Sequence, residues 1–233
     1  MSVFSSLKSA LTLAALAACA LAPMQQASAQ TAAWPSKPVR IIVSFPPGGT
    51  SDIVARLIGQ HLTDKLGQQF IVDNRPGAGG TLAGELVHKE APDGYTLILA
   101  NNAPFTIAPT QFKKIPYDPV ADFTHIGYIG ASAPGLLVQP SLGVKNLGDF
   151  IALARKDPKI SYGSSGVGSI SHILGEGVKK KAGIAMVHVP YKGSAPAIQD
   201  FKAGVLKTYY DLLAQNVPCL LYTSDAADDL LCV

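Results

Sequence analysis

The residues best suited to hold a ligand lie in a proline- and glycine-rich turn near the start of the chain. Residues 39–45 form an apolar, β-branched run that predicts a buried strand, which ends in Pro46, Pro47, Gly48 and Gly49. An amphipathic helix pattern follows at once, with Thr50 or Ser51 as its expected N-cap and Asp52 in its first turn. Glycines expose backbone N–H groups, and a helix N-terminus favours negative charge. The stretch therefore predicts a carboxylate or phosphate site, although an ordinary tight turn fits it as well.

A second loop of similar chemistry lies at residues 163–169, Gly-Ser-Ser-Gly-Val-Gly-Ser, between an expected strand at 159–162 and an expected helix at 170–181. Its candidate ligand-binding residues are Ser164, Ser165, Gly166 and Ser169. Two such loops facing one another across a cleft could hold a small anion from both sides and close by a hinge.

Alternating strands and helices must position these loops. We expect strands at 69–73 and 95–100 after the first, with a helix between them that ends near Glu90. The helix after the first loop is expected to bury one apolar face, made of Ile53, Val54, Leu57, Ile58, Leu62 and Leu66. This β-α-β-α-β order predicts an α/β fold with a mostly parallel sheet. Ligands bind at the carboxyl ends of such strands, where Asn101 and Asn102 lie.

The same order returns further along the chain. Residues 123–130 and 136–138 are strand candidates, and 146–155 is a helix with Asn146 as its N-cap. After the second loop, strands are expected at 185–189 and 205–212, with a helix at 197–202. The repetition predicts two similar lobes. Asp211 ends an apolar strand, where it could orient a ligand amine or hydroxyl or simply cap a turn.

The sequence gives weaker support to three other interpretations: a dinucleotide-binding site, a serine hydrolase and a metal site. A dinucleotide fingerprint at the second loop lacks its third glycine, which is Ser171, and no Walker motif follows either loop. A serine hydrolase could use Ser164 or Ser165 with His172, but the loop forms no G-x-S-x-G elbow, and His172 also fits a partly buried helix position. Metal ligation would need clustered histidines, whereas His61, His88, His125, His172 and His188 are dispersed. We expect no cofactor, no metal and no catalytic residue.

Composition and the N-terminus indicate an exported protein. The 233 residues carry a formal net charge of only +3 and are 15% charged, which argues against nucleic-acid binding. Residues 1–29 resemble a secretory signal, with Lys8, an apolar run and Ala27-Ser28-Ala29 as the cleavage site. A lipobox ending at Cys19 is the alternative, with a lipid anchor. Residues 30–218 contain no cysteine, so the body must rely on its hydrophobic core.

Several blocks together resemble the Bug family, the periplasmic solute-binding proteins of tripartite tricarboxylate transporters. The matching blocks are Trp34-Pro35-x-x-Pro38-Val39-Arg40, Pro47-Gly48-Gly49-x-x-Asp52, residues 74–80 (NRPGAGG), 92–95 (PDGY), 164–169 (SSGxGS) and 189–193 (VPYKG). The resemblance implies a two-lobed, type II periplasmic-binding-protein fold and a small carboxylate ligand. It also implies that Pro47, Gly48, Gly49 and Thr50, supported by Asp52, and the serines and Gly166 of the second loop contact that ligand.

The chain departs from the family pattern at its C-terminal end. The stretch Cys219–Val233 resembles a translated sequencing adapter more than a protein segment, which predicts a truncated gene model with an incomplete second lobe. The expected organisation is a signal peptide at 1–29, lobe 1 at 30–130, a partial lobe 2 at 131–218 and a non-native tail at 219–233.

The sequence thus predicts a periplasmic receptor that is not an enzyme. It would capture a di- or tricarboxylate, or an acidic amino acid, and deliver it to membrane transporter subunits. Its candidate ligand-binding residues are Pro47, Gly48, Gly49, Thr50, Asp52, Asn102, Ser164, Ser165, Gly166, Ser169 and Asp211. An exported serine hydrolase and a sensory ligand-binding module remain the alternatives.

Overall fold

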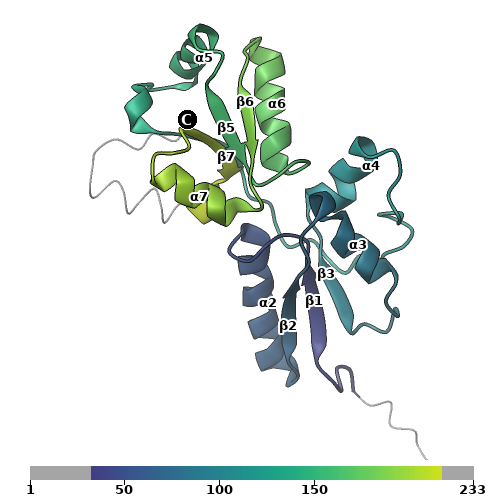
Figure 1. The fold of residues 1–233 in the computed structure, drawn as a ribbon. Helices are drawn as coiled ribbons and strands as arrows, with labels where there is room; N and C mark the ends of the chain where they lie inside the picture. The colour runs from purple at the N-terminus through teal and green to yellow at the C-terminus, as the bar shows by residue number, and fades with distance from the viewer. Residues whose placement is uncertain (1–32, 217–233) are drawn as a thin grey trace, which may run out of the picture. The chain divides into compact units, whose positions relative to one another are not determined.

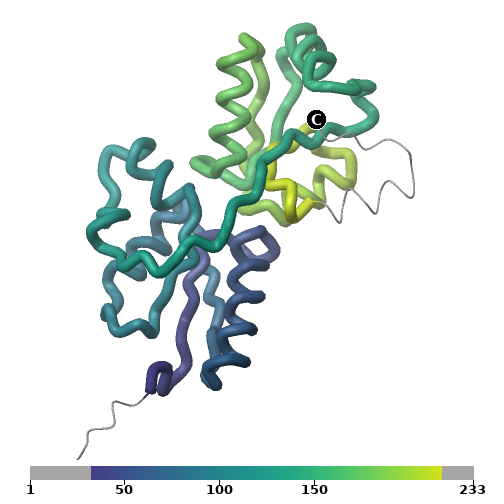
Figure 2. Tube along the Cα trace, turned by 180° about the vertical axis from the view of Figure 1, so that it is seen from behind, coloured from purple at the N-terminus to yellow at the C-terminus, as the bar shows by residue number. Residues whose placement is uncertain are grey.

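The computed structural model describes residues 33–216, drawn as a ribbon in Figure 1 and as a tube in Figure 2. The expected signal peptide with Cys19 and the expected non-native tail at 219–233 lie outside the described residues. None of the helices in the described part is long and apolar enough to cross a membrane.

The first sheet has three parallel strands in the order β2-β1-β3. They are β1 (Val39–Val43), β2 (Phe70–Asn74) and β3 (Thr96–Leu99). The helices α2 (Thr50–Leu66) and α3 (Thr81–His88) lie on opposite sides of this sheet in Figure 1. The central strand carries the core, because Val39, Ile42 and Val43 have no exposed surface. The predicted β-α-β-α-β order is therefore confirmed.

The predicted apolar face of α2 is wrong in part: Leu62 packs against the core, and Val54 and Ile58 are half-buried. The buried residues of α2 are Asp52, Ala55 and Gly59, whereas 67% of Leu57 and 45% of Ile53 is exposed. The reason is close packing against the sheet: a Cβ at Gly59 would lie 3.2 Å from the Phe70 carbonyl oxygen. Small residues let the helix approach the strands, so Ile53, Leu57 and Leu66 lie outside the contact face. The N-cap also differs, because Gly49 rather than Thr50 or Ser51 precedes the helix.

The second sheet has four strands in the order β4-β7-β5-β6. They are β4 (Pro134–Val138), β5 (Ser161–Ser164), β6 (Val187–Pro190) and β7 (Thr208–Leu212), and only β4 runs antiparallel to its neighbour. The helices are α5 (Leu147–Lys156), α6 (Ile170–Ala182) and α7 (Ser194–Lys202). The predicted cap of α5 is confirmed: Asn146 accepts a hydrogen bond from the Asp149 N–H at 2.9 Å.

The strand predicted at 123–130 is wrong. These residues pair with no strand of the described part, and Figure 2 shows them within an irregular segment that leads to β4. Ile126 is 81% exposed and Tyr128 84% exposed. The preceding stretch contains a short π-helix, Ala103–Ile107, and the short helix α4 (Ala108–Gln111). The apolar pattern alone favoured a strand here, but an extended segment becomes a strand only when a neighbouring backbone supplies its hydrogen bonds.

Candidate ligand-binding site

The first glycine loop (residues 44–49) joins the buried strand β1 to the N-terminus of α2. Gly48 has φ +86°, a conformation that side-chain-bearing residues rarely adopt. Its N–H donates to the Asp52 Oδ2 atom at 3.0 Å. The loop is therefore shaped from within the helix it precedes, and the Gly48 N–H already has a partner.

Asp52 is a buried carboxylate held by donors on several sides. Arg56 donates to its two oxygens at 3.1 Å and 2.9 Å, in addition to the Gly48 N–H. Burial alone would raise the pKa of Asp52, but the hydrogen bonds from Arg56 and Gly48 outweigh it and lower that pKa below its usual value. Asp52 is thus ionised at neutral pH and shapes the loop. Because both carboxylate oxygens of Asp52 already accept hydrogen bonds from the protein, Asp52 suits the expected role of supporting the first glycine loop.

Asn101 joins β3 to the first glycine loop, a contact that the sequence analysis did not assign. Its side-chain amide donates to Ser44 Oγ at 3.1 Å and to Ser51 Oγ at 3.3 Å, and its oxygen accepts from the Ala103 N–H. The predicted ligand-binding residue Asn102 is exposed and precedes the π-helix. The position after a parallel strand was a valid signal, but two adjacent asparagines gave no way to choose between them.

The second glycine loop (residues 165–169) joins β5 to α6 and contains two glycines with positive φ, Gly166 and Gly168. Ser169 is the N-cap of α6, and its hydroxyl donates to the Gly166 carbonyl oxygen at 2.6 Å. The fully buried Ser171 hydroxyl accepts from the Ser165 N–H at 3.1 Å and lies 3.0 Å from Ser165 Oγ. Ser171, noted in the sequence only as a missing glycine, therefore holds the loop together.

Two histidines lie directly against this loop. His188 Nε2 is 2.6 Å from Ser164 Oγ, and His172 Nδ1 accepts from the Gly168 N–H at 3.2 Å. The two imidazole rings stack with their centroids 4.2 Å apart. Burial lowers the pKa of His188 to about 4, and the neighbouring His172 adds to the shift. Both a Ser–His pair and a second ring therefore exist here, which sequence spacing did not indicate.

The Ser164–His188 pair is poorly placed for hydrolysis. Ser164 has no exposed surface, so its hydroxyl cannot reach a substrate carbonyl in this conformation. The same hydroxyl also contacts the N–H and the carbonyl of Gly166 at 3.2 Å and 3.3 Å. Its geometry is that of a loop-shaping side chain.

Asp211 lies near the end of β7 and is 3% exposed. One side chain, Gln215, connects it to the N-terminus of α2 just after the first glycine loop. Ser194 and Asn216 donate to its carboxylate at 3.2 Å and 3.0 Å, and Gln215 Nε2 donates to it as well. The oxygen of the Gln215 amide accepts from both the N–H and the hydroxyl of Thr50, at 2.6 Å and 2.7 Å. Nothing in the sequence indicated Gln215, because it follows the last expected strand.

The two glycine loops are linked through the turn before α7. The Gly193 N–H donates to the Ser165 carbonyl oxygen at 3.1 Å, and a Cβ at Gly193 would lie 3.0 Å from Pro46 Cγ. A Cβ at Gly48 would lie 3.5 Å from Ala195 Cβ. Residues from three strand–helix junctions therefore meet, and backbone and hydroxyl donors gather where an anion would be stabilised.

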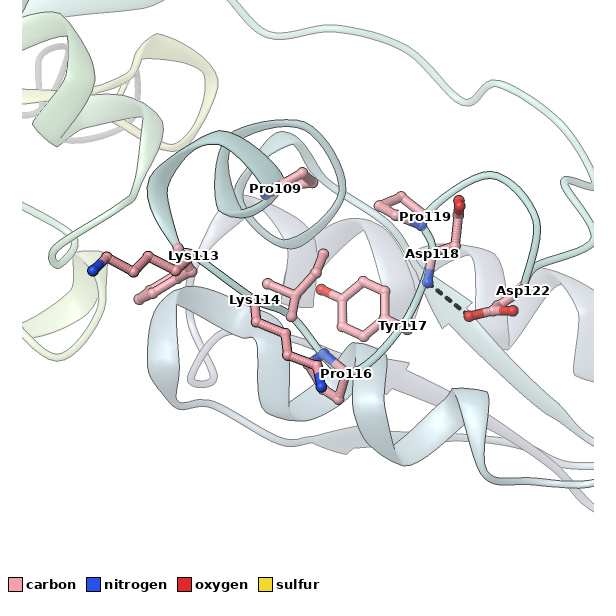
Figure 3. Close-up of a pocket in the computed structure, with 10 residues that line it drawn as sticks. Pro109, Lys113, Lys114, Pro116, Tyr117, Asp118, Pro119 and Asp122 are labelled. Carbon is pink, nitrogen blue, oxygen red and sulfur yellow. Dashed lines mark hydrogen bonds between the residues drawn. The ribbon is translucent and has the colours of Figure 1, made fainter.

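An open hollow of about 520 Å³ lies elsewhere, around residues 109–122 (Figure 3). Tyr117 lies at its centre, where the phenol donates to the Pro104 carbonyl oxygen at 2.7 Å. Neither glycine loop lines it. Among the residues that the structure describes, no three His, Cys, Asp or Glu side chains gather in a way that could hold a metal ion. The glycine loops thus remain the best candidate site.

Comparison with known proteins identifies related sequences and structures. Residues 54–219 match the sequence model of the tripartite tricarboxylate transporter family receptors. The protein BugT of Bordetella pertussis is 35% identical over 190 residues, which cover 81% of this chain and 57% of BugT. The chain thus spans a little over half the length of such curated relatives.

Solved structures share the fold. R. palustris Rpa4515, determined with adipate, is 35% identical with a TM-score of 0.78, and the match covers 86% of this chain and 66% of that protein. MatC of Rhodopseudomonas palustris, determined with bound malate, is 31% identical with a TM-score of 0.75, over 81% of this chain and 65% of MatC. The α/β fold of periplasmic binding proteins, predicted from the sequence, is therefore confirmed.

Proposed function

Because the chain belongs to the tripartite tricarboxylate transporter receptor family, we propose that it is a periplasmic solute-binding receptor. It captures a small carboxylate at the two glycine loops and delivers it to membrane transporter subunits. The observation that carries the proposal is the meeting of the first loop, the second loop and the turn at Gly193. Relatives of known structure hold adipate and malate, which are small dicarboxylates.

The ligand is expected to use donors that the protein leaves available or can release. The N–H groups of Gly48, Ser165 and Gly168 are occupied by internal acceptors. The Thr50 N–H and hydroxyl instead share one acceptor, the Gln215 amide oxygen. That oxygen occupies the position a carboxylate oxygen would take at the N-terminus of α2. We therefore propose that the carboxylate replaces Gln215 at Thr50 and reaches the Ser165 hydroxyl with its other end.

The remaining candidates keep the roles that their contacts suit. Pro47 and Gly49 belong to the first loop, which Asp52 fixes through the Gly48 N–H. Ser164, at the end of β5, and Ser169 both form hydrogen bonds with Gly166 of the second loop. Asp211 holds Gln215 in place, which leaves the Gln215 oxygen directed at Thr50. Asn102 is exposed, so Asn101 is the better candidate after β3.

The protein is proposed to be a binding protein without catalytic activity. Ser164 is fully buried, and among the described residues the partner of His188 is this serine and not a carboxylate. A hydrolase would need an exposed nucleophile with an oriented base. Export by residues 1–29 and the division into lobes at residues 30–130 and 131–218 complete the proposal.

A thermal-shift panel tests this function. Citrate, succinate, malate, adipate and glutamate are added separately to the full chain, and the melting temperature is measured. In a separate assay, a nitrophenyl ester is offered as a substrate for hydrolysis. A ligand at about a hundred times its Kd should add about 2.7 kcal/mol to the unfolding free energy. We expect at least one carboxylate to raise the melting temperature and no ester turnover. Turnover abolished by Ser165→Ala, without any carboxylate effect, would contradict the proposal.

A further inference from the structure

The second glycine loop is held by a side chain that plays no part in the proposed ligand contacts. His172, in the first turn of α6, accepts the Gly168 N–H through Nδ1 at 3.2 Å. Gly168 has φ +81°, and a Cβ there would lie 2.5 Å from Gln111 Oε1. The positive φ therefore favours glycine at this position, and the Gly168 N–H points to the ring that accepts it.

This hydrogen bond defines the protonation state of the ring. A backbone N–H can only donate, so His172 Nδ1 must carry a lone pair and the imidazole must be neutral. A protonated ring has N–H groups at both nitrogens and cannot accept from Gly168. The contact between His188 and Ser164 makes no such demand, because a serine hydroxyl can donate or accept. Of the two histidines, His172 is therefore the one whose protonation would break a hydrogen bond of the second glycine loop.

The surroundings keep the ring in place and disfavour its charge. His172 stacks on His188 of β6, which in turn stacks on Tyr162 of β5 at 4.9 Å. Of the charged groups on its own helix, Glu176 and Lys179 act on the ring, and they pair with each other at 2.8 Å; Lys180 and Lys181 follow in the last turn. Burial lowers the pKa of His172, Lys179 lowers it further, and Glu176 opposes the shift.

We propose that His172 is a positioning residue for carboxylate binding, which acts as a neutral acceptor that orients the Gly168 peptide and with it the second glycine loop. The inference rests on the proposed function, since it concerns the same loop. It assigns to His172 neither ligand contact nor catalysis. Its consequence is that carboxylate affinity falls when this one ring gains a proton.

Two substitutions separate this role from simple packing. His172→Asn places an amide oxygen near the position of Nδ1, so it keeps an acceptor that does not titrate. His172→Phe keeps the ring and its stacking but has no acceptor. If His172 were only a packed ring, phenylalanine would be the better replacement. If it is an acceptor, asparagine is the better replacement.

The test measures Kd for malate and adipate by calorimetry with the wild type and both variants, from pH 7.5 to pH 5. We expect His172→Asn to bind as the wild type does at pH 7.5, and His172→Phe to bind about three- to tenfold more weakly. The ratio of wild-type Kd to His172→Asn Kd, in which ligand ionisation cancels, should rise as the pH is lowered, toward a limit equal to the about three- to tenfold loss expected of His172→Phe. A flat ratio, or full affinity in His172→Phe, would overturn the proposal.

A second readout does not depend on ligand binding. Amide hydrogen exchange of Gly168 should be slow in the wild type and in His172→Asn, and about tenfold faster in His172→Phe. Equal exchange in all three would overturn the positioning role even if carboxylates bind. Conversely, failure of every carboxylate to bind, with the expected exchange pattern, would count against the proposed function and leave the orientation of Gly168 by His172 supported.

Discussion

At the scale of single residues, the site depends on side chains that occupy backbone donors. Asp52 takes the Gly48 N–H, Ser171 takes the Ser165 N–H, and Gln215 takes the Thr50 N–H. The first two are fixed by further contacts in their own elements. Gln215 differs because its oxygen competes for the group that a carboxylate would use. The loops are therefore preorganised, and in the proposed binding mode the contact of Gln215 with Thr50 is exchanged for one with the ligand.

Removing the competing amide should strengthen binding. Gln215→Ala deletes the acceptor that holds the Thr50 N–H and hydroxyl at 2.6 Å and 2.7 Å. Because the ligand no longer displaces these hydrogen bonds, we expect Kd for malate or adipate to fall about three- to tenfold. Calorimetry measures it, with Gln199→Ala, an exposed glutamine of α7, as the matched control. Weaker binding in Gln215→Ala would show instead that Gln215 supports the bound ligand.

At the scale of elements, small residues decide how closely helices approach the sheets. Gly59 of α2 lies against Phe70, and Gly175 of α6 lies against Tyr162. The sequence predicted the positions of both helices correctly, because the change from a glycine-rich turn to a helical pattern is a local property. The sequence could not show that Ala55 and Gly59 would form the contact face of α2 while Leu57 stays exposed, since that depends on the partner surface.

Two glycines of α6 allow a controlled test of this packing. A Cβ at Gly175 would overlap the Tyr162 ring, whereas a Cβ at Gly177 would have nothing within 4 Å. Gly175→Ala should lower the unfolding free energy by about 1–3 kcal/mol through overpacking. Gly177→Ala should raise it by about 0.5–1 kcal/mol, because alanine is the better helix former. Urea denaturation followed by circular dichroism measures both. Equal effects of the two substitutions would contradict the packing described for α6.

Both glycine loops could be predicted from the sequence because the signals for a strand, a glycine turn and a helix N-terminus follow one another directly along the chain. The sequence analysis missed Asn101, His188 and Gln215 as contacts because their partners are 24 to 165 positions away along the chain. The failed strand at 123–130 has the same cause. Local apolarity favoured an extended backbone there, and pairing depends on which segment lies alongside.

At the scale of the molecule, stability should depend on pH through the buried imidazole of His188. Its pKa in the folded state is lowered to about 4, mainly by burial, from a usual value near 6.5. The unfolded chain therefore binds a proton more readily than the folded one between these values. The contribution of neutral His188 to the unfolding free energy is fully present above about pH 6.5 and is lost as the pH drops toward 4.

Urea midpoints measured from pH 7.5 to pH 4 check this dependence. In His188→Asn the fall between pH 6.5 and 4 should be smaller, because one buried titrating group is gone. The control is His61→Gln, an exposed histidine of α2, which should behave as the wild type does. A fall of unchanged size in His188→Asn would mean that other groups govern the acid sensitivity.

Together, the two glycine loops are proposed to bind one carboxylate ligand. An NMR titration of the ¹⁵N-labelled protein with malate or adipate tests it most directly. We predict that amides of Gly48 to Thr50 and of Ser165 to Gly168 shift with a single common Kd. Shifts confined to one loop, or centred on the hollow around Tyr117, would contradict a shared site.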